Sequence, residues 1–261
     1  MRIRGITLVE LLVALVILGA LMAAFTGFFV STLRTTSDFD RRNELLIEGQ
    51  IAHQLLVSRL QEAWFVYPSG QSIILSSPAV WQTTNPTTGS NVWTVGSNFV
   101  AVVLPPLDIR AACNPAVPGQ TGGCYRFFAY YPLGRAAYVA NTAGDIFARL
   151  PADAANAGAW VLMQYSAFLE SAAVVAGSTA PTAGALTTMG GVTVALVADY
   201  LAPGSAPFAI SEVAVGPPAI RQVRVNLQLS RVVQGRTFTA GGSGSSLSST
   251  VQPRNQGVLA P

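Results

Sequence analysis

The chain has 261 residues, of which 51% are hydrophobic and only 10% are charged, a low charge content for a soluble globular protein. Its length suits one large domain or two small ones. All fifteen basic residues are arginine, a bias that we attribute to the base composition of the genome, and with twelve acidic residues they leave a net charge of +3. This charge is too small to indicate nucleic-acid binding by itself.

The chain begins with a long apolar segment that contains one unexpected acid. Residues 11–33 carry no charge, and as a helix these 23 residues would cover about 35 Å, enough to cross a bilayer core of about 30 Å. Arg2 and Arg4 precede the segment, as the positive-inside rule expects of a membrane anchor. Glu10 lies inside the apolar stretch, where a charge costs about 2.5–3.5 kcal/mol. The run is too long for a secretory signal, no A-x-A cleavage site follows it, and a plain anchor does not explain the acid.

The stretch RGITLVELL, residues 4–12, resembles the N-terminal signature of type IV prepilins and type II secretion pseudopilins. The resemblance implies that a prepilin peptidase cleaves between Gly5 and Ile6 and methylates the new N-terminus at Ile6. Glu10 then becomes the fifth residue of the mature chain, the acidic position of the family. Ile6 departs from the pattern, because phenylalanine or methionine is commoner there. Cleavage would remove Arg2 and Arg4 and leave a net charge of +1.

This resemblance gives Glu10 an assembly role. In the family, the acid of an incoming subunit is thought to meet the N-terminal amine of its neighbour. Two unit charges 4 Å apart attract by about 4 kcal/mol at an effective dielectric constant of 20. The contact would set the axial register of helices whose surfaces are otherwise uniformly apolar.

We expect one N-terminal helix with two parts, after a leader peptide at residues 1–5. Residues 6–33 are the predicted transmembrane and assembly helix, and residues 34–64 its amphipathic continuation. Apolar residues recur in the second part at helical spacing and should face a core: Leu45, Ala52, Leu56, Leu60 and Ala63. His53 should be a solvated or capped surface residue of this part, and Pro68 and Gly70 mark its end.

Two glycines interrupt the apolar part of the helix. Gly19 and Gly27 each weaken a helix by about 1 kcal/mol relative to alanine. In major type IV pilins, a glycine and a proline near these positions let the helix melt in the filament. Close packing of neighbouring helices through small residues is the alternative, and both explanations remain open.

Residues 65–261 are expected to form a β-rich globular domain. Short β-branched or aromatic runs begin at residues 72, 98 and 124. The clearest alternation is IRQVRVNLQLSRVV, residues 220–233, which predicts one half-buried antiparallel strand with Val223, Val225, Leu227 and Leu229 on the core side. A turn at Gln234 and Gly235, a flexible loop at residues 240–249 and a last short strand in SSTVQPRN should follow. This end resembles the closing hairpin of larger minor pilins and minor pseudopilins, and the predicted class is an α+β pilin fold.

Cys113 and Cys124 are the two cysteines of the chain, separated by a segment rich in proline and glycine. Beyond a membrane anchor the compartment is oxidising, so we expect a disulfide, which would stabilise the fold by about 3 kcal/mol in the chain-entropy model. Two buried thiols are the alternative. A zinc site is disfavoured because His53 is the only histidine.

These features predict a minor pilin that helps to assemble or initiate a type IV pilus, with roles in twitching motility and DNA uptake during natural transformation. The alternatives are a minor pseudopilin of a type II secretion system and an anchored binding domain that does not assemble. An enzyme is not expected, because no catalytic constellation is recognisable, and no cofactor is expected. The implied partners are the prepilin peptidase, other pilins or pseudopilins, the inner-membrane assembly platform and membrane lipid.

The expected location is the inner membrane, with one span and a periplasmic domain, and the pilus at the cell surface after assembly. DNA is a further partner to consider, because some competence pilins bind it and four arginines cluster near the C-terminus: Arg221, Arg224, Arg231 and Arg236. Arg221 and Arg224 have opposite parity on a strand, so the pattern favours a solvated sheet face over a DNA-binding stripe.

Overall fold

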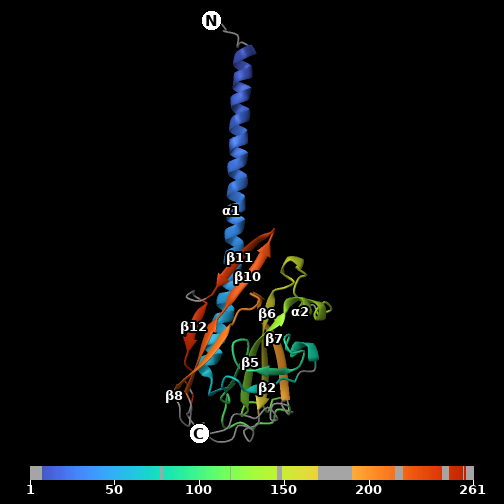
Figure 1. Ribbon diagram of the computed structural model, residues 1–261, viewed down its shortest axis with the longest axis vertical. Coiled ribbons are helices and arrows are strands. Elements are labelled where there is room, and N and C mark those ends of the chain that lie inside the picture. Colours follow the sequence, from blue (N-terminus) through green and yellow to red (C-terminus); the bar gives the residue numbers. More distant parts are fainter. Residues whose placement is uncertain are drawn as a thin grey trace. The chain divides into compact units, whose positions relative to one another are not determined.

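A computed structural model describes residues 8–76, 79–117, 119–145, 149–169, 190–214, 220–242, 247–254 and 256 of the chain (Figure 1). The chain divides into two compact units, Met1–Glu44 and Leu45–Pro261. The predicted leader, with Gly5 and Ile6, lies outside the described residues. The long helix α1, Leu8–Glu62, contributes its first part to one unit and its last part to the other.

The last part of α1 has one buried face, made by Leu45, Gly49, Ala52, Leu56 and Leu60. The apolar residues predicted to face the core, Ala63 included, are all buried, which confirms the amphipathic pattern. The helix ends at Glu62, two residues before the expected end at 64. The reason lies in its neighbours, because the N–H of Trp64 bonds the carbonyl of Val103 at 2.8 Å and the N–H of Arg254 bonds the last-turn carbonyl of Gln61 at 3.0 Å.

In the part of the chain that the structure describes, three antiparallel sheets accompany the helix. The largest has seven strands in the order β1 (Phe65–Val66), β4 (Val100–Leu104), β5 (Tyr125–Gly134), β6 (Trp160–Leu169), β7 (Gly190–Leu201), β10 (Gln228–Val233) and β11 (Arg236–Gly241). A second sheet contains β12 (Ser248–Val251), β9 (Ile220–Asn226) and β8 (Phe208–Ala214), and a third pairs β2 (Ser72–Ile74) with β3 (Val92–Thr94). The short helices are η1 (Val80–Gln82), α2 (Arg135–Asn141) and η2 (Ala154–Asn156). The predicted α+β class, a long helix with antiparallel sheets, is confirmed.

The middle of the large sheet is covered on both faces. In β4, Val100 and Val102 face the core that contains α1 and the second sheet, whereas Ala101 and Val103 face another core. That other core is closed by β2, β3 and α2, through residues such as Trp93. Strands buried on both faces read as nearly continuous hydrophobic runs, which explains why the central strands carry so few polar residues.

The predicted single strand at residues 220–233 is wrong, because the chain forms two strands there, in different sheets. β9 pairs with β8 and β12, whereas β10 pairs with β11 and β7. The break is at Leu227, whose N–H bonds Leu247 at 3.0 Å and whose carbonyl accepts the N–H of Gly242 at 2.9 Å. The alternating residues predicted to face the core are nevertheless all buried, because both sheets border the same core. Alternation in the sequence therefore reports which face is buried and does not report which strand is the partner.

The turn predicted after this segment is confirmed. Gln234 and Gly235 have φ of 51° and 76° and join β10 to β11 as a two-residue hairpin with both central residues at positive φ. The flexible loop predicted at residues 240–249 is too long, because β11 extends through Gly241, Leu247 is buried and β12 begins at Ser248. Residues 243–246 lie outside the described residues. β12 pairs with β9 rather than with this hairpin.

Candidate assembly helix

The first part of α1 presents an apolar surface all round. Its large hydrophobic residues between Leu8 and Leu33 are each at least 42% exposed: Leu8, Val9, Leu11, Leu12, Val13, Leu15, Val16, Ile17, Leu18, Leu21, Met22, Phe25, Phe28, Phe29, Val30 and Leu33. By length and composition α1 qualifies as a candidate membrane span. Soluble proteins rarely expose contiguous apolar patches larger than a few hundred Å², so this helix requires lipid or other protein around it.

Two threonine hydroxyl groups in this part of the helix are satisfied within the helix itself. Thr26 donates to the carbonyl of Met22 at 2.8 Å, and Thr32 donates to the carbonyl of Phe28 at 2.9 Å. Polar groups in hydrocarbon need an internal partner because water is absent there. The two threonines are therefore compatible with an apolar environment.

Glu10 lies in the first turn of the described helix, on the exposed apolar surface. Its expected partner, the amine of a processed Ile6, lies outside the described residues. The positive end of the helix dipole favours an acid in the first turn, by about 0.3–1 kcal/mol. This is less than the cost of a charge in the bilayer, so the dipole alone does not account for the acid.

Gly19 and Gly27 have no neighbours that require glycine. A Cβ built on either residue meets nothing within 4 Å, and α1 continues as a helix through both positions. Packing within this chain therefore does not explain them. Helix flexibility and close packing against other helices are the two explanations that remain.

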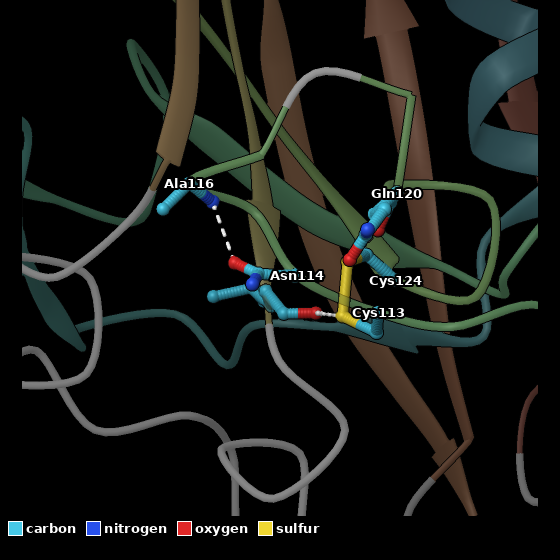
Figure 2. Close-up of a disulfide and its surroundings, with 6 residues drawn as sticks. Cys113, Asn114, Ala116, Gln120 and Cys124 are labelled. Atoms are coloured by element: carbon cyan, nitrogen blue, oxygen red, sulfur yellow. Dashed lines mark hydrogen bonds between the residues drawn. A yellow bond between two sulfur atoms is a disulfide. The ribbon is translucent and has the colours of Figure 1, made fainter.

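The two cysteines form a disulfide in the globular unit. Figure 2 shows Cys113 and Cys124 bridged, with their Cα atoms 4.7 Å apart. The enclosed loop is held by its own bonds: Asn114 donates its N–H to the carbonyl of Gln120 at 2.7 Å, and its side-chain oxygen accepts the N–H of Ala116 at 3.1 Å. The structure thus shows the expected bridge rather than two free thiols.

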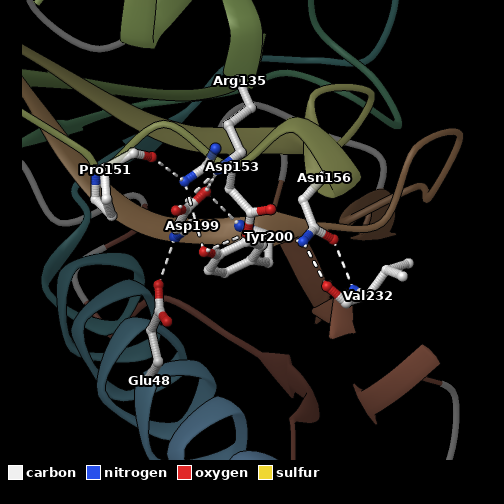
Figure 3. Close-up of polar contacts among 8 residues, drawn as sticks. All are labelled: Glu48, Arg135, Pro151, Asp153, Asn156, Asp199, Tyr200 and Val232. Carbon is white, nitrogen blue, oxygen red and sulfur yellow. Dashed lines mark hydrogen bonds and ion pairs between the residues drawn. The ribbon is translucent and has the colours of Figure 1, made fainter. Parts of the chain in front are cut away.

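A buried ion pair in the globular unit has no motif in the sequence. Arg135, at the start of α2, is 1% exposed and donates its Nε to both carboxylate oxygens of Asp199, at 2.9 and 3.1 Å. It also donates to the carbonyl of Pro151 at 3.0 Å, and the N–H of Asp199 donates to the carboxylate of Glu48 on α1 (Figure 3). Burial lowers the pKa of Arg135, but the hydrogen bond and charge of Asp199 raise it overall.

Tyr200 completes this cluster and carries backbone strain. Its φ is 55°, unusual for a residue other than glycine, and its ring lies under the guanidinium groups of Arg135 and Arg231, at 4.8 and 4.6 Å from the ring centroid. Its hydroxyl donates to Asp153 at 3.2 Å.

Asn156, in η2, binds both backbone groups of Val232 in β10, at 2.8 and 2.7 Å. The cluster joins α1, β7, β10 and the segment around η2, and its contacts are those of a fold-stabilising centre.

Of the remaining residues that the sequence singled out, His53, Arg221 and Arg231 are engaged in the fold. His53 is half-buried rather than solvated, and its Nε2 lies 3.0 Å from the hydroxyl of Ser249 in β12. Arg221 pairs with Glu212 at 3.0 Å and stacks over Phe65 at 5.7 Å, so its guanidinium is not on a solvated sheet face. Arg231 stacks on Tyr200, whereas the side chain of Arg224 is exposed. The arginines therefore do not form one continuous basic stripe.

Comparison with known proteins identifies the N-terminus. Residues 1–26 match the family model of the prokaryotic N-terminal methylation motif. No curated protein and no solved structure matches the chain. The motif is the type IV prepilin signature, and the long apolar helix that follows it fits that signature.

The chain thus carries the type IV prepilin signature over residues 1–26, in agreement with the resemblance seen in the sequence. Proteins with this motif are structural subunits rather than enzymes. The motif implies processing by the prepilin peptidase and assembly with other pilins. Together with the apolar helix it supports membrane anchoring and a location in a pilus or at the cell surface.

Proposed function

We propose that this chain is a minor pilin, a subunit that helps to assemble or initiate a type IV pilus used in twitching motility and DNA uptake. The observation that carries the proposal is the exposed apolar helix with the prepilin motif and with Glu10 in its first described turn. Most of the chain belongs to the unit Leu45–Pro261. This unit is large for a major pilin, which repeats along the whole filament.

Before assembly, the precursor is held in the inner membrane by residues 11–33, with the globular unit in the periplasm. Arg2 and Arg4 at the cytoplasmic end support this orientation. The disulfide between Cys113 and Cys124 independently supports a periplasmic globular unit, because structural disulfides persist in the oxidising periplasm and are rare in the cytosol. The assembly platform then passes the mature subunit from lipid into the filament.

In assembly, cleavage between Gly5 and Ile6 exposes an amine that is methylated and remains positively charged. Glu10 of an incoming subunit binds the amine of its neighbour. The apolar helices attract each other without preferring one axial position, because their exposed residues are similar all along the surface. One ion pair in low dielectric adds about 4 kcal/mol of gross attraction at a single register and so fixes the subunit there.

The test replaces Glu10 by valine and, separately, by aspartate. We expect Glu10→Val to be cleaved normally, so that mass spectrometry finds N-methylated Ile6 as first residue, but to lose incorporation into sheared filaments. Glu10→Asp keeps the charge and should retain part of the incorporation. Gly5→Leu is the processing control and should leave an uncleaved precursor in the membrane. Normal incorporation of Glu10→Val would refute the registry role.

A deletion strain separates a pilus from a secretion system. Loss of twitching and DNA uptake with normal protein export is the result we expect. Loss of export with normal twitching would instead assign the chain to the minor pseudopilins of type II secretion.

A further inference from the structure

Sheet edges expose backbone N–H and C=O groups, and folded proteins usually protect them with short strands, bulges, charges or prolines. Among the described sheet edges of this chain, the outer edge of β11 is long and lacks such protection.

The other edges are protected in different ways. β1 has two residues, and the carbonyl of Val66 accepts a bond from Arg221 at 3.1 Å. β8 has a register shift between Glu212 and Ala214 and carries the ion pair of Glu212 with Arg221. β12 has four residues and is soon followed by Pro253.

The strands of the third sheet, β2 and β3, have three residues each. β7 is the remaining long strand, since it meets β10 at Leu201 only. Its pairing with β6 shows three register shifts, and Gly191 within it has φ of 63°. Bulged and twisted strands of this kind resist the addition of a further strand.

β11 differs from all of these. It has six residues that pair with β10 without a register shift, its only charge is Arg236 at the turn, and its one residue with positive φ, Gly241 at 87°, is the last of the strand. Thr237 and Thr239 are exposed, and Phe238 between them is half-buried. Among the described residues, no strand other than β10 pairs with β11.

The hairpin geometry shows which backbone groups face outward. Residues that flank a two-residue turn, here Val233 and Arg236, exchange hydrogen bonds, and bonded pairs then alternate along an antiparallel ladder. The hydrogen bond from the N–H of Gly242 to the carbonyl of Leu227 continues this alternation, because Leu227 and Gly242 fall at the next bonded position after Leu229 and Ala240. The N–H and C=O groups of Thr237 and Thr239 therefore point away from β10.

We infer that this edge binds an extended segment of a different subunit of the same filament, which adds a strand beside β11. The inference rests on the proposed function in assuming a filament. The edge presents outward N–H and C=O groups on every second residue, with a spacing of about 6.8 Å. An extended polypeptide has the same spacing and can bond to them. The neutral threonine side chains favour a segment that is β-branched or polar and has no proline at the bonding positions.

A second copy of this chain is a poorer occupant. Identical edges that pair with each other form a closed two-fold contact, whereas a filament grows through contacts between two different surfaces. The other described edges of a second copy are protected, so they offer no matching surface to β11. The partner is therefore a different subunit.

The experiment places a photo-crosslinking amino acid at Thr237 or Thr239 in the full-length protein of piliated cells. The matched control position is Ser211, which is also exposed but lies on the protected edge of β8. We expect both β11 positions to give an adduct with another filament subunit, mapped by mass spectrometry, and Ser211 to give none. No adduct at the β11 positions, or an adduct only with a second copy, would overturn the inference.

A backbone variant tests the hydrogen bonds directly. With the crosslinker at Thr237, Thr239→Pro removes an outward N–H and no bond to β10, and should lower the adduct at least tenfold. Thr239→Val keeps the N–H and should preserve it. An adduct undiminished in Thr239→Pro would contradict strand addition. If Glu10→Val blocks incorporation while Thr239→Pro changes nothing, the strand inference alone fails; if Glu10→Val has no effect, the failure lies in the proposed function.

Discussion

Arg135 and Asp199 form an ion pair that is almost completely removed from water, with 1% and 7% of the two side chains exposed. Removing one partner of a buried pair leaves the other charge without compensation, which typically costs about 3–5 kcal/mol. We therefore expect Arg135→Ala to lower the free energy of unfolding of the globular unit by about this amount. Urea titration of the full-length protein in detergent, followed by tryptophan fluorescence, measures the change.

Two controls accompany this substitution. Arg110→Ala removes an exposed arginine and should change the stability by less than about 0.5 kcal/mol. The double variant Arg135→Met with Asp199→Leu removes both charges and should recover much of the loss, because a buried pair can often be replaced by apolar residues. A loss below about 1 kcal/mol in Arg135→Ala would show that water reaches Asp199.

His53 gives the globular unit a dependence on pH. It lies outside the apolar segment 11–33, and burial lowers its pKa below the ordinary value of 6.5. Between the lowered pKa and 6.5 the unfolded chain binds more protons than the folded one, so stability must fall as the pH drops through this window. We expect the urea midpoint to decrease from about pH 7.5 to about pH 5 by a larger amount in the wild type than in His53→Gln. Equal decreases in both proteins would contradict this role.

At the scale of elements, α1 meets the sheets closely at Gly49. A Cβ on this residue would lie 2.6 Å from a methyl group of Leu247 and 2.9 Å from one of Leu229. Overpacking a core usually costs about 1–3 kcal/mol, so we expect Gly49→Val to destabilise the globular unit by that amount. Gly27→Val is the matched control, since a Cβ there meets nothing within 4 Å. Thermal unfolding in detergent compares the two, and equal midpoints would mean that Leu229 and Leu247 move aside freely.

The elements that the sequence predicted well are those specified by neighbouring residues. The buried face of α1 follows from spacing within one helix, and the turn at Gln234 and Gly235 follows from its own residues. The change of sheet at Leu227 depends instead on its hydrogen bonds with Gly242 and Leu247, which lie much further along the chain. Partner choice between strands is non-local, so alternation alone could not reveal it.

The same limit applies to the sites. The prepilin motif is contiguous, and its match over residues 1–26 agrees with the resemblance in the sequence. The cluster around Arg135 joins residues from 48 to 232, and no short motif holds them. One signal was available, since Asp199 ends a long stretch without charges, and an isolated charge in a neutral β-rich segment is a candidate for a buried pair.

At the scale of the whole molecule, the chain separates two tasks between two units. Among the described residues, every buried hydrophobic side chain belongs to Leu45–Pro261, and the part of Met1–Glu44 that the structure describes contributes none. Leu45–Pro261 thus contains the described cores, while the apolar surface from Leu8 to Leu33 remains for lipid or neighbouring subunits. Changes to the buried residues of Leu45–Pro261 should therefore affect folding, and changes to the apolar surface from Leu8 to Leu33 should affect assembly.

This separation predicts how truncation acts. A chain that begins at Arg41 loses no buried side chain of the described part and should unfold within about 0.5 kcal/mol of the full-length protein. A chain that begins at Val57 also loses Leu45, Ala52 and Leu56, all at most 2% exposed. Each buried leucine contributes about 2–5 kcal/mol, and a domain's whole stability is about 5–15 kcal/mol, so the shorter chain should not fold. Urea unfolding measures the stability of the chain that begins at Arg41, and circular dichroism shows whether the chain that begins at Val57 folds. A marked loss of stability on truncation to Arg41 would mean that the unit Met1–Glu44 supports the fold as well as the filament.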